Sequence, residues 1–370
     1  MVAAASVVVA VGTATGMVSA LDDGRGANEA RPEVTESPTL DLRPPAPSTS
    51  VTSGSASPST APKKQASPTP TKTEKKQPPA HTAARLYRHP DSQVLDWVRD
   101  NAGDPRYDVI ASRIADQPAA VWFAEYAPDT VTARVRAVTG GAAAQGRVPV
   151  VVAYTIPDRD CGGASKGGAP DLDAYDAWID RFAAGLGSGE VVVILEPDSI
   201  AQSECLSGAR RADRFASLAR AGRVIKAANP KARVYYDAGH SGWHPAAKQA
   251  DLLRQAGAGS AASSDGIFSN VSNFHRTADE IAYDRRVLTA LGGPASLGAV
   301  IDTSRNGNGA PADGEWCDPD GRKLGRTPTL NTGEARIDGY LWVKLPGESD
   351  GCKGAPGTFT PSYAYDLASS

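Results

Sequence analysis

Two continuous apolar runs constrain the fold of this chain more than any other feature. Residues 148–154 and 191–195 are rich in valine and lack the polar alternation of a half-exposed strand. Such runs are typical of strands that are covered on both faces, as in a parallel sheet. Each run leads to an acid beside a proline, since Pro157 precedes Asp158 and Pro197 precedes Asp198. Because proline donates no N–H to a sheet, these acids should lie where the strands end.

Acids at the end of a strand have two interpretations. In barrels and open sheets of the α/β class, catalytic groups gather at the carboxyl ends of the strands. An acid in this position can also simply cap the helix that follows. Because two strands share the same pattern, we favour a catalytic carboxylate pair.

Strand-like and helix-like segments alternate along most of the chain. We expect strands at residues 119–126, 147–154, 190–195, 233–237, 266–270, 297–302 and 339–344. Amphipathic stretches lie between them at about 171–186, 208–228, 245–257 and 276–292. This alternation predicts right-handed βαβ units and a parallel sheet. The fold class is therefore α/β, and about seven strands favour a barrel over an open sheet.

The first eighty residues differ in composition from the rest. Residues 2–20 carry no charge and end in the small residues Val18-Ser19-Ala20, the pattern of a signal-peptidase site. No basic stretch precedes this run, and its length also suits an uncleaved anchor. We interpret residues 1–20 as a signal peptide or membrane anchor, which places the protein outside the cytoplasm. Residues 21–83 are rich in Pro, Ser, Thr and Lys and should form a disordered linker.

Residues 84–370 are long enough for a single catalytic domain with a full core. The chain has 39 Lys and Arg against 42 Asp and Glu, a net charge of −3, which argues against a nucleic-acid partner. An even number of cysteines in an exported chain favours disulfides, and no C-x-x-C pair suggests zinc. Three pairings are open, and nearest neighbours are the simplest choice among the four cysteines, Cys161, Cys205, Cys317 and Cys352.

Polar and aromatic residues follow nearly every predicted strand. The set comprises Asp160, Asp198, Asp237, Asn270, Asp302 and Lys344, with several tryptophans nearby. Indole rings stack on the apolar faces of sugars, while carboxylates and amides bind their hydroxyls. Cleavage of a glycosidic bond needs two carboxyl groups in opposite protonation states. We expect Trp122, Trp243 and Trp316 to contact ligand, and Trp97, Trp178 and Trp342 to pack in the core.

His240 and His244 have the spacing of two metal ligands on one helical face. However, no Glu follows the first histidine, Gly242 interrupts a helix, and Pro245 comes next. A hydrogen-bonding or substrate-contact role is therefore favoured over metal binding. We expect no metal and no cofactor.

At these residues the sequence resembles glycoside hydrolase family 6, the inverting cellulases. Residues 152–163 resemble one family signature, and residues 194–200 resemble the other. Further matches occur at residues 237–240, 301–307, 315–317, 342–344 and 346–352. The resemblance covers residues 84–367 and none of the first eighty. It implies a distorted parallel β/α barrel with seven strands and the disulfides 161–205 and 317–352.

The resemblance also implies catalytic roles. It makes Asp198 the general acid that protonates the leaving glycosidic oxygen. Asp160 then keeps Asp198 protonated and relays a proton from water, while Asp350 lies where the family's proposed base lies, and both remain rivals for the base. Tyr154 is expected to press the sugar ring toward a distorted shape. Asp237 should support the site electrostatically or bind substrate.

The same resemblance implies sugar contacts at Trp122, His240, Trp243, Asn270, Trp316, Lys344 and Glu348. Asp158 departs from the pattern as a third acid, which either raises the pKa of its neighbours or faces solvent. About seven residues separate Asn331 from Gly339, and the segment after Cys352 is short, which predicts an open cleft.

An open cleft favours internal cutting, so the expected function is that of an inverting endo-β-1,4-glucanase. The alternatives are an exo-acting, cellobiohydrolase-type glucanase and a non-catalytic glucan-binding protein on the same scaffold. We expect a secreted or extracellular monomer, with or without a membrane anchor. Its partner should be a β-glucan polysaccharide or a cello-oligosaccharide.

Overall fold

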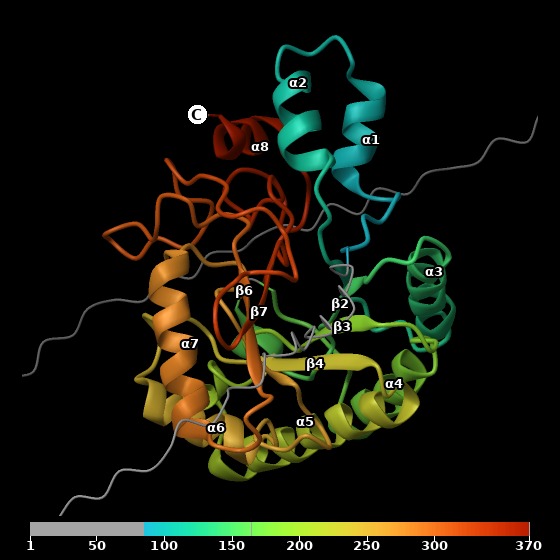
Figure 1. Ribbon diagram of the computed structural model, residues 1–370, viewed down its shortest axis with the longest axis vertical. Coiled ribbons are helices and arrows are strands. Elements are labelled where there is room, and N and C mark those ends of the chain that lie inside the picture. Colours follow the sequence, from blue (N-terminus) through green and yellow to red (C-terminus); the bar gives the residue numbers. More distant parts are fainter. Residues whose placement is uncertain (1–84, 164, 370) are drawn as a thin grey trace, which may run out of the picture. The chain divides into compact units, whose positions relative to one another are not determined.

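Seven parallel strands form one sheet, which curls into an incomplete barrel (Figure 1). The computed structural model describes residues 85–163 and 165–369, so the expected signal or anchor and the linker lie outside the described residues. The strands pair in chain order: β1 (Val121–Phe123), β2 (Val150–Ala153), β3 (Val191–Leu195), β4 (Ala232–Asp237), β5 (Gly266–Ser269), β6 (Gly298–Asp302) and β7 (Ile337–Leu341). At the seam between β1 and β7, Ala120 N donates to Trp342 O at 2.9 Å without a strand ladder. The expected distorted barrel is thus confirmed.

Helices cover the outside of the sheet (Figure 1). They are α3 (Val131–Ala144), α4 (Leu172–Ala183), α5 (Gly208–Ala228), α6 (Ala246–Gln255) and α7 (Thr277–Leu291). A separate group shares its own small core and comprises α1 (Gln93–Asp100), α2 (Tyr107–Ile110), the π-helical turn η1 (Ala111–Ala115) and α8 (Pro361–Ala368). Two 3₁₀ turns, η2 (Arg159–Gly162) and η3 (Ser203–Cys205), follow β2 and β3. Every helix in residues 85–163 and 165–369 falls short of what a membrane span requires.

The two valine-rich runs become strands buried on both faces. Val151 and Val193 point into the outer core between the sheet and the helices. Val152 and Ile194 point into the barrel interior, together with Tyr235. This double burial explains why the runs show no polar alternation.

The structure confirms all seven predicted strands and the four predicted helices. The last strand ends at Leu341, three residues earlier than expected. Lys344 therefore belongs to the loop after β7, one of the loops at the carboxyl ends of the strands that form the rim of the barrel. Helix α3 was not predicted, because adjacent glycines, Gly140 and Gly141, weaken a helical pattern. A Cβ at Gly141 would lie 2.6 Å from the Tyr87 hydroxyl, so the N-terminal segment packs closely on α3 at this glycine.

Candidate active site

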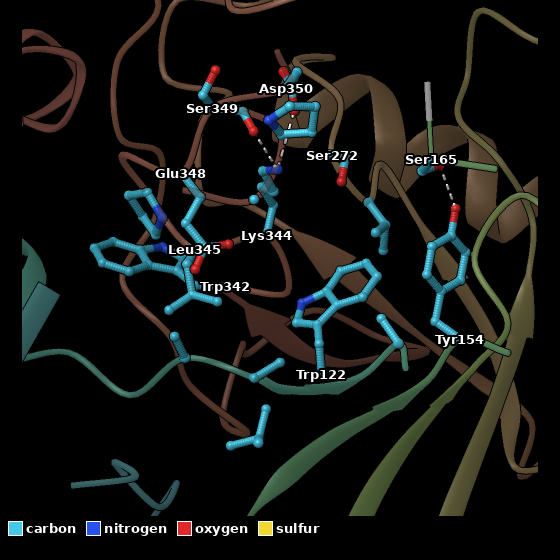
Figure 2. A pocket seen from close by; sticks show the side chains of 18 of the residues that line it. Trp122, Tyr154, Ser165, Ser272, Trp342, Lys344, Leu345, Glu348, Ser349 and Asp350 are labelled. Carbon is cyan, nitrogen blue, oxygen red and sulfur yellow. Dashed lines mark hydrogen bonds and ion pairs between the residues drawn. The ribbon is translucent and has the colours of Figure 1, made fainter. Parts of the chain in front are cut away.

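A cleft of about 1140 Å³ lies at the carboxyl ends of the strands. Its lining brings together every predicted catalytic and sugar-binding residue except Asp237 and Asn270. Figure 2 shows Trp122 and Tyr154 on one side, with Lys344, Glu348 and Asp350 opposite. The cleft therefore joins residues that are more than two hundred positions apart in the sequence.

Asp198 projects into the cleft from the loop after β3. Its backbone is left-handed, with φ of 67°, which turns the chain sharply after Pro197. Burial, followed by the nearby charges of Asp237 and Asp160, raises the pKa of Asp198 to about 8. The carboxyl group is therefore mainly protonated at neutral pH, as a general acid requires.

Glu196, the other acid of this motif, does not line the cleft. It is fully buried and accepts hydrogen bonds from the backbone N–H groups of Thr155, at 3.1 Å, and Ile156, at 2.9 Å. Burial raises the pKa of Glu196 to about 7, although these two hydrogen bonds oppose the shift. Glu196, directly after β3, is thus hydrogen-bonded to the backbone of the loop that follows β2.

Asp237 lies behind Asp198 and is only 2% exposed. Its carboxylate accepts hydrogen bonds from the backbone N–H groups of Ile200, Ala201 and Gly239 at 3.0, 2.8 and 2.9 Å. Burial raises its pKa against the effect of these bonds. Of the two predicted roles, this geometry favours electrostatic support of Asp198 over substrate contact.

Asp160 lines the cleft from the loop after β2. Its Oδ2 accepts from the backbone N and the Oγ of Ser165 at 2.8 and 3.0 Å. The Ser165 hydroxyl also lies 2.8 Å from the Tyr154 hydroxyl (Figure 2). Sequence reasoning missed Ser165, which has no motif of its own and connects Asp160 to the tyrosine.

Asp350 sits between two cations. Its carboxylate oxygens lie 2.7 Å from the fully buried Arg305 guanidinium and 3.2 Å from the Lys344 ammonium. Both oxygens are thus engaged by protein groups. Arg305 was part of a matched motif in the sequence, but this ion pair across 45 residues was not foreseen.

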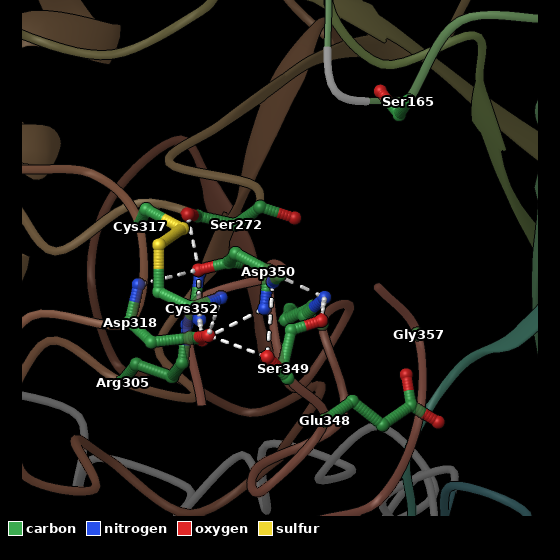
Figure 3. Close-up of polar contacts among 12 residues, drawn as sticks. Ser165, Ser272, Arg305, Cys317, Asp318, Glu348, Ser349, Asp350, Cys352 and Gly357 are labelled. Carbon is green, nitrogen blue, oxygen red and sulfur yellow. Dashed lines mark hydrogen bonds and ion pairs between the residues drawn. A yellow bond between two sulfur atoms is a disulfide. The ribbon is translucent and has the colours of Figure 1, made fainter. Parts of the chain in front are cut away.

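Asp318 organises the loop that carries Asp350 (Figure 3). It accepts from Asp350 N at 2.7 Å, from Ser349 Oγ at 2.5 Å and from Cys352 N at 3.0 Å. Although burial opposes it, hydrogen bonding from Ser349 and the loop amides lowers the pKa of Asp318 to about 2. The one sequence signal for this overlooked residue is its position directly after Cys317.

Both expected disulfides are present, Cys161–Cys205 and Cys317–Cys352. The first joins the loops after β2 and β3, which carry Asp160 and Asp198. The second lies beside Asp318 (Figure 3).

The predicted ligand tryptophans all line the cleft. Trp316 is 56% exposed, and Trp122 donates its Nε1 to Val343 O at 2.7 Å. Trp243 lies 5.1 Å from the His240 ring. In contrast, Trp178 is fully buried, and Trp342 is also buried although it borders the cleft.

His240 is a neutral group in the cleft wall. Its ring stacks on His275 with centroids 4.2 Å apart. Burial, followed by the proximity of His275 and His244, lowers its pKa to about 3. His244 is buried, and its Nε2 forms a hydrogen bond with Ala201 O at 2.9 Å. Across residues 85–163 and 165–369, no cluster of three or more His, Cys, Asp or Glu side chains is arranged to hold a metal ion.

Asn270 lies behind the wall of the cleft. It is fully buried, donates to Asp302 O at 2.9 Å and to His275 O at 3.2 Å, and accepts from His275 N at 3.0 Å. Its amide is therefore used to join two rim loops. Asn273, three residues further on, lines the cleft and was not predicted.

Glu348 lines the cleft close to the ion pair of Asp350. Burial raises its pKa to about 7, although Lys344 and Arg305 oppose this. Gln93 of α1 donates to Glu348 Oε1 at 3.3 Å and to Gly357 O at 2.8 Å. Gln93 thus connects helix α1 to the residues around Glu348 and Gly357 that line the cleft.

Two short segments led to the prediction of an open cleft, and only one of them borders the cleft. Residues 331–336 precede β7 and lie at the opposite end of the barrel, so the length of that connection has no bearing on the cleft. The short segment after Cys352 does border it, through Pro356, Gly357 and Phe359. Asp158 faces solvent, with its side chain 54% exposed, and pairs with Arg210 of α5.

Comparisons with known proteins agree with this geometry. A family model for glycosyl hydrolases family 6 matches residues 81–366. Endoglucanase 1 of Streptomyces sp. (strain KSM-9) is 53% identical over 284 residues, which are 76% of this chain and 77% of that protein. Endoglucanase A of Thermobispora bispora is 50% identical over 78% of this chain and 63% of its own length.

A solved structure is also similar. It is the endoglucanase Cel6 from Mycobacterium tuberculosis in complex with methyl-cellobiosyl-4-deoxy-4-thio-β-D-cellobioside. The match has a TM-score of 0.71 and 39% sequence identity, and it covers 78% of this chain and 97% of that chain.

Proposed function

Because the chain belongs to glycosyl hydrolases family 6, we propose that it hydrolyses internal β-1,4-glucosidic bonds in cellulose or related β-glucans with inversion of configuration. The observation that carries this proposal is Asp198, a carboxyl group in the cleft with a pKa of about 8. A neutral carboxylic acid can give its proton to the leaving glycosidic oxygen. Asp237 and Asp160 keep it protonated, since each further negative charge disfavours its ionisation.

An inverting reaction also needs a group that takes a proton from the attacking water. We assign this role to Asp160, acting through water. Only its Oδ2 has a partner among the described residues, which leaves Oδ1 available. Asp350 is the weaker candidate, because Arg305 and Lys344 occupy both of its oxygens.

The remaining lining residues would hold the sugar chain. Trp122, Trp243 and Trp316 would stack on glucose rings, and Tyr154 would press the ring at the cleavage point toward an oxocarbenium-like shape. Lys344, Glu348 and His240 would bind hydroxyl groups. Asn270 would hold the two loops that it joins in position, and Asn273 would contact the sugar directly.

The central test replaces Asp198 with Asn, which keeps the shape of the side chain but cannot serve as the acid. We expect turnover of carboxymethylcellulose to fall by about 10²–10⁴-fold, while calorimetry shows nearly unchanged binding of cello-oligosaccharides. In the wild type, activity should decline as pH rises through about 8, since Asp198 then loses its proton. Asp213→Asn, an exposed acid on α5, serves as the control. Unchanged hydrolysis by Asp198→Asn would sink the assignment.

Two product measurements separate the alternatives. Proton NMR of the first product should show the α-anomer, and a β-anomer would exclude inversion. Internal cutting should lower the viscosity of carboxymethylcellulose early, when few reducing ends have formed. An exo-acting glucanase would release reducing ends with little loss of viscosity, and a non-catalytic binding protein would release none.

We further propose that the protein works outside the cytoplasm as a monomer. The two disulfides support this location, because such bonds persist in oxidising compartments. Fractionation of the producing cells would distinguish a released protein from one that stays anchored in the membrane through residues 1–20.

A further inference from the structure

The loops that carry Asp160 and Asp198 are joined at several points. The Cys161–Cys205 disulfide connects them near their tips. Glu196 connects their bases through the backbone of Thr155 and Ile156. A third connection comes from outside both loops, from helix α5.

Arg214 of α5 provides this third connection. Its guanidinium donates through Nη2 to Pro157 O at 2.7 Å and to Asp158 O at 3.1 Å, both in the loop of Asp160. Through Nη1 it also donates to Ser199 O at 3.4 Å, directly after Asp198. One side chain thus bridges the two loops at carbonyls close to both carboxylates.

The surroundings of Arg214 are unusual for a cation. The residue is only 3% exposed, and no carboxylate in the described part of the chain lies within ion-pair distance of it. Of the surrounding charges, those of Asp158 and Glu196 stabilise the guanidinium most, and the charge of Arg210 opposes them. Burying an unpaired cation is costly, so packing alone is a poor reason for an arginine here.

We propose that Arg214 is a positioning residue that sets the separation of Asp160 and Asp198 by bridging their loops. The inference rests on the proposed role of Asp198 as general acid. The planar guanidinium group of Arg214 reaches acceptors on both loops at once, which a single ammonium group cannot do.

This role has a consequence for the pH profile. The groups that face Asp198 are Asp160, Asp237 and Tyr154, and the charge of Asp160 helps to keep it protonated. If the bridge is lost and Asp160 moves away, the repulsion weakens and the pKa of Asp198 falls. The alkaline limb of the activity profile should then move to lower pH.

The experiment measures kcat and KM for a soluble cello-oligosaccharide from pH 4 to pH 10. Arg214→Met removes both the charge and the bridge, whereas Arg214→Lys keeps the charge without the fork. We expect both variants to move the alkaline limb by about half a pH unit or more toward acid, and to lower kcat about tenfold with little change in KM. Arg223→Met, an exposed arginine on the same helix, should match the wild type.

Asp160→Asn provides the reference for the pKa of Asp198 itself, followed by NMR titration of the Asp198 carboxyl group because this variant lacks the proposed base, and it should give a larger fall in that pKa than either Arg214 variant. An unchanged alkaline limb in both Arg214 variants would overturn the proposal, whatever happens to their melting temperatures. Failure of both variants to fold would overturn it too, since Arg214 would then serve the fold and not the site. Retained activity in Asp198→Asn would contradict the proposed function, whereas an unchanged alkaline limb in the Arg214 variants would contradict only the positioning role. The two failures are therefore distinguishable.

Discussion

The carboxylate of Asp350 belongs to a buried network of charged groups. Arg305 is fully buried, and its closest anionic partner is Asp350 at 2.7 Å, with Asp318 further away at 3.8 Å. A buried charge that loses its partner destabilises the folded state strongly. Loss of activity on mutation of Asp350 would therefore not identify it as the base.

We predict that Asp350→Ala lowers the free energy of unfolding by about 3 kcal/mol. This value is at the lower end of the range typical of broken buried ion pairs, because Asp318 still faces Arg305. Denaturation in guanidinium chloride measures the change. Asp320→Ala, which removes a 92% exposed partner of Lys353, should leave the midpoint almost unchanged. A normal midpoint for Asp350→Ala would show that the ion pair contributes little.

At the scale of residues, the acids were predictable because each follows a strand or a matched motif. Residues that act through the backbone were harder to find. Asn270 and Asn273 are the same residue type in one short segment, and only the folded chain shows that the second lines the cleft. Asp318 bonds to a loop more than thirty residues away, and sequence spacing gives no information about that contact.

At the scale of elements, helix α7 holds two buried acids one turn apart, Glu280 and Asp284. Glu280 accepts from Ser241 N at 2.9 Å, and Asp284 accepts from Ser269 Oγ at 3.0 Å. Burial raises the pKa of both, and Glu280 raises that of Asp284 further, well above its usual range. The pair therefore retains protons in the folded state that the unfolded chain releases above about pH 4.

Since the folded state binds more protons, this pair makes stability fall as pH rises from about 4 toward the raised pKa values. We predict that Asp284→Asn weakens this dependence, leaving the part due to Glu280, and raises stability at pH 8 by about 1 kcal/mol or more, with little gain at pH 4. Melting temperatures across this range provide the test. Asp279→Asn, an exposed acid on the same helix, is the matched control. An equal effect at both pH values would contradict the prediction.

The helices that alternate with the strands were predictable, except for the glycine-containing α3, and the short helices outside this alternation were not. Helix α5 occupies the predicted residues 208–228, because its apolar positions recur at helical spacing. Helix α3 contains two adjacent glycines, and the short helices α1, α2 and α8 share a small core of their own. Tertiary packing, which a local pattern cannot reveal, determines these elements.

At the scale of the whole molecule, the catalytic domain should fold without residues 1–83. The chain enters the barrel at residues 85–87, where Leu86 bridges to Val148 and Tyr87 N donates to Val148 O at 2.8 Å. Both side chains are buried, in the interior and the outer core respectively. The boundary of the domain thus lies just before Leu86.

We predict that a protein starting at residue 84 keeps the melting temperature and the kcat/KM on carboxymethylcellulose of the full chain. A protein starting at residue 90 loses Leu86 and Tyr87 and should be less stable by at least about 2–5 kcal/mol. Thermal melting and activity on the soluble polymer check both variants. Loss of stability in the longer variant would place part of the domain before residue 84.

The two disulfides connect rim loops, and none of the barrel strands contains a cysteine. The hydrogen bonds of Glu196, Arg214 and Asp318 can therefore form while all four thiols are reduced, and oxidation adds one covalent link to the loops of Asp160 and Asp198 and one to the loop of Asp350. A molecule kept in a reducing compartment would have the same sheet and helices, with its active-site loops held by hydrogen bonds and ion pairs alone.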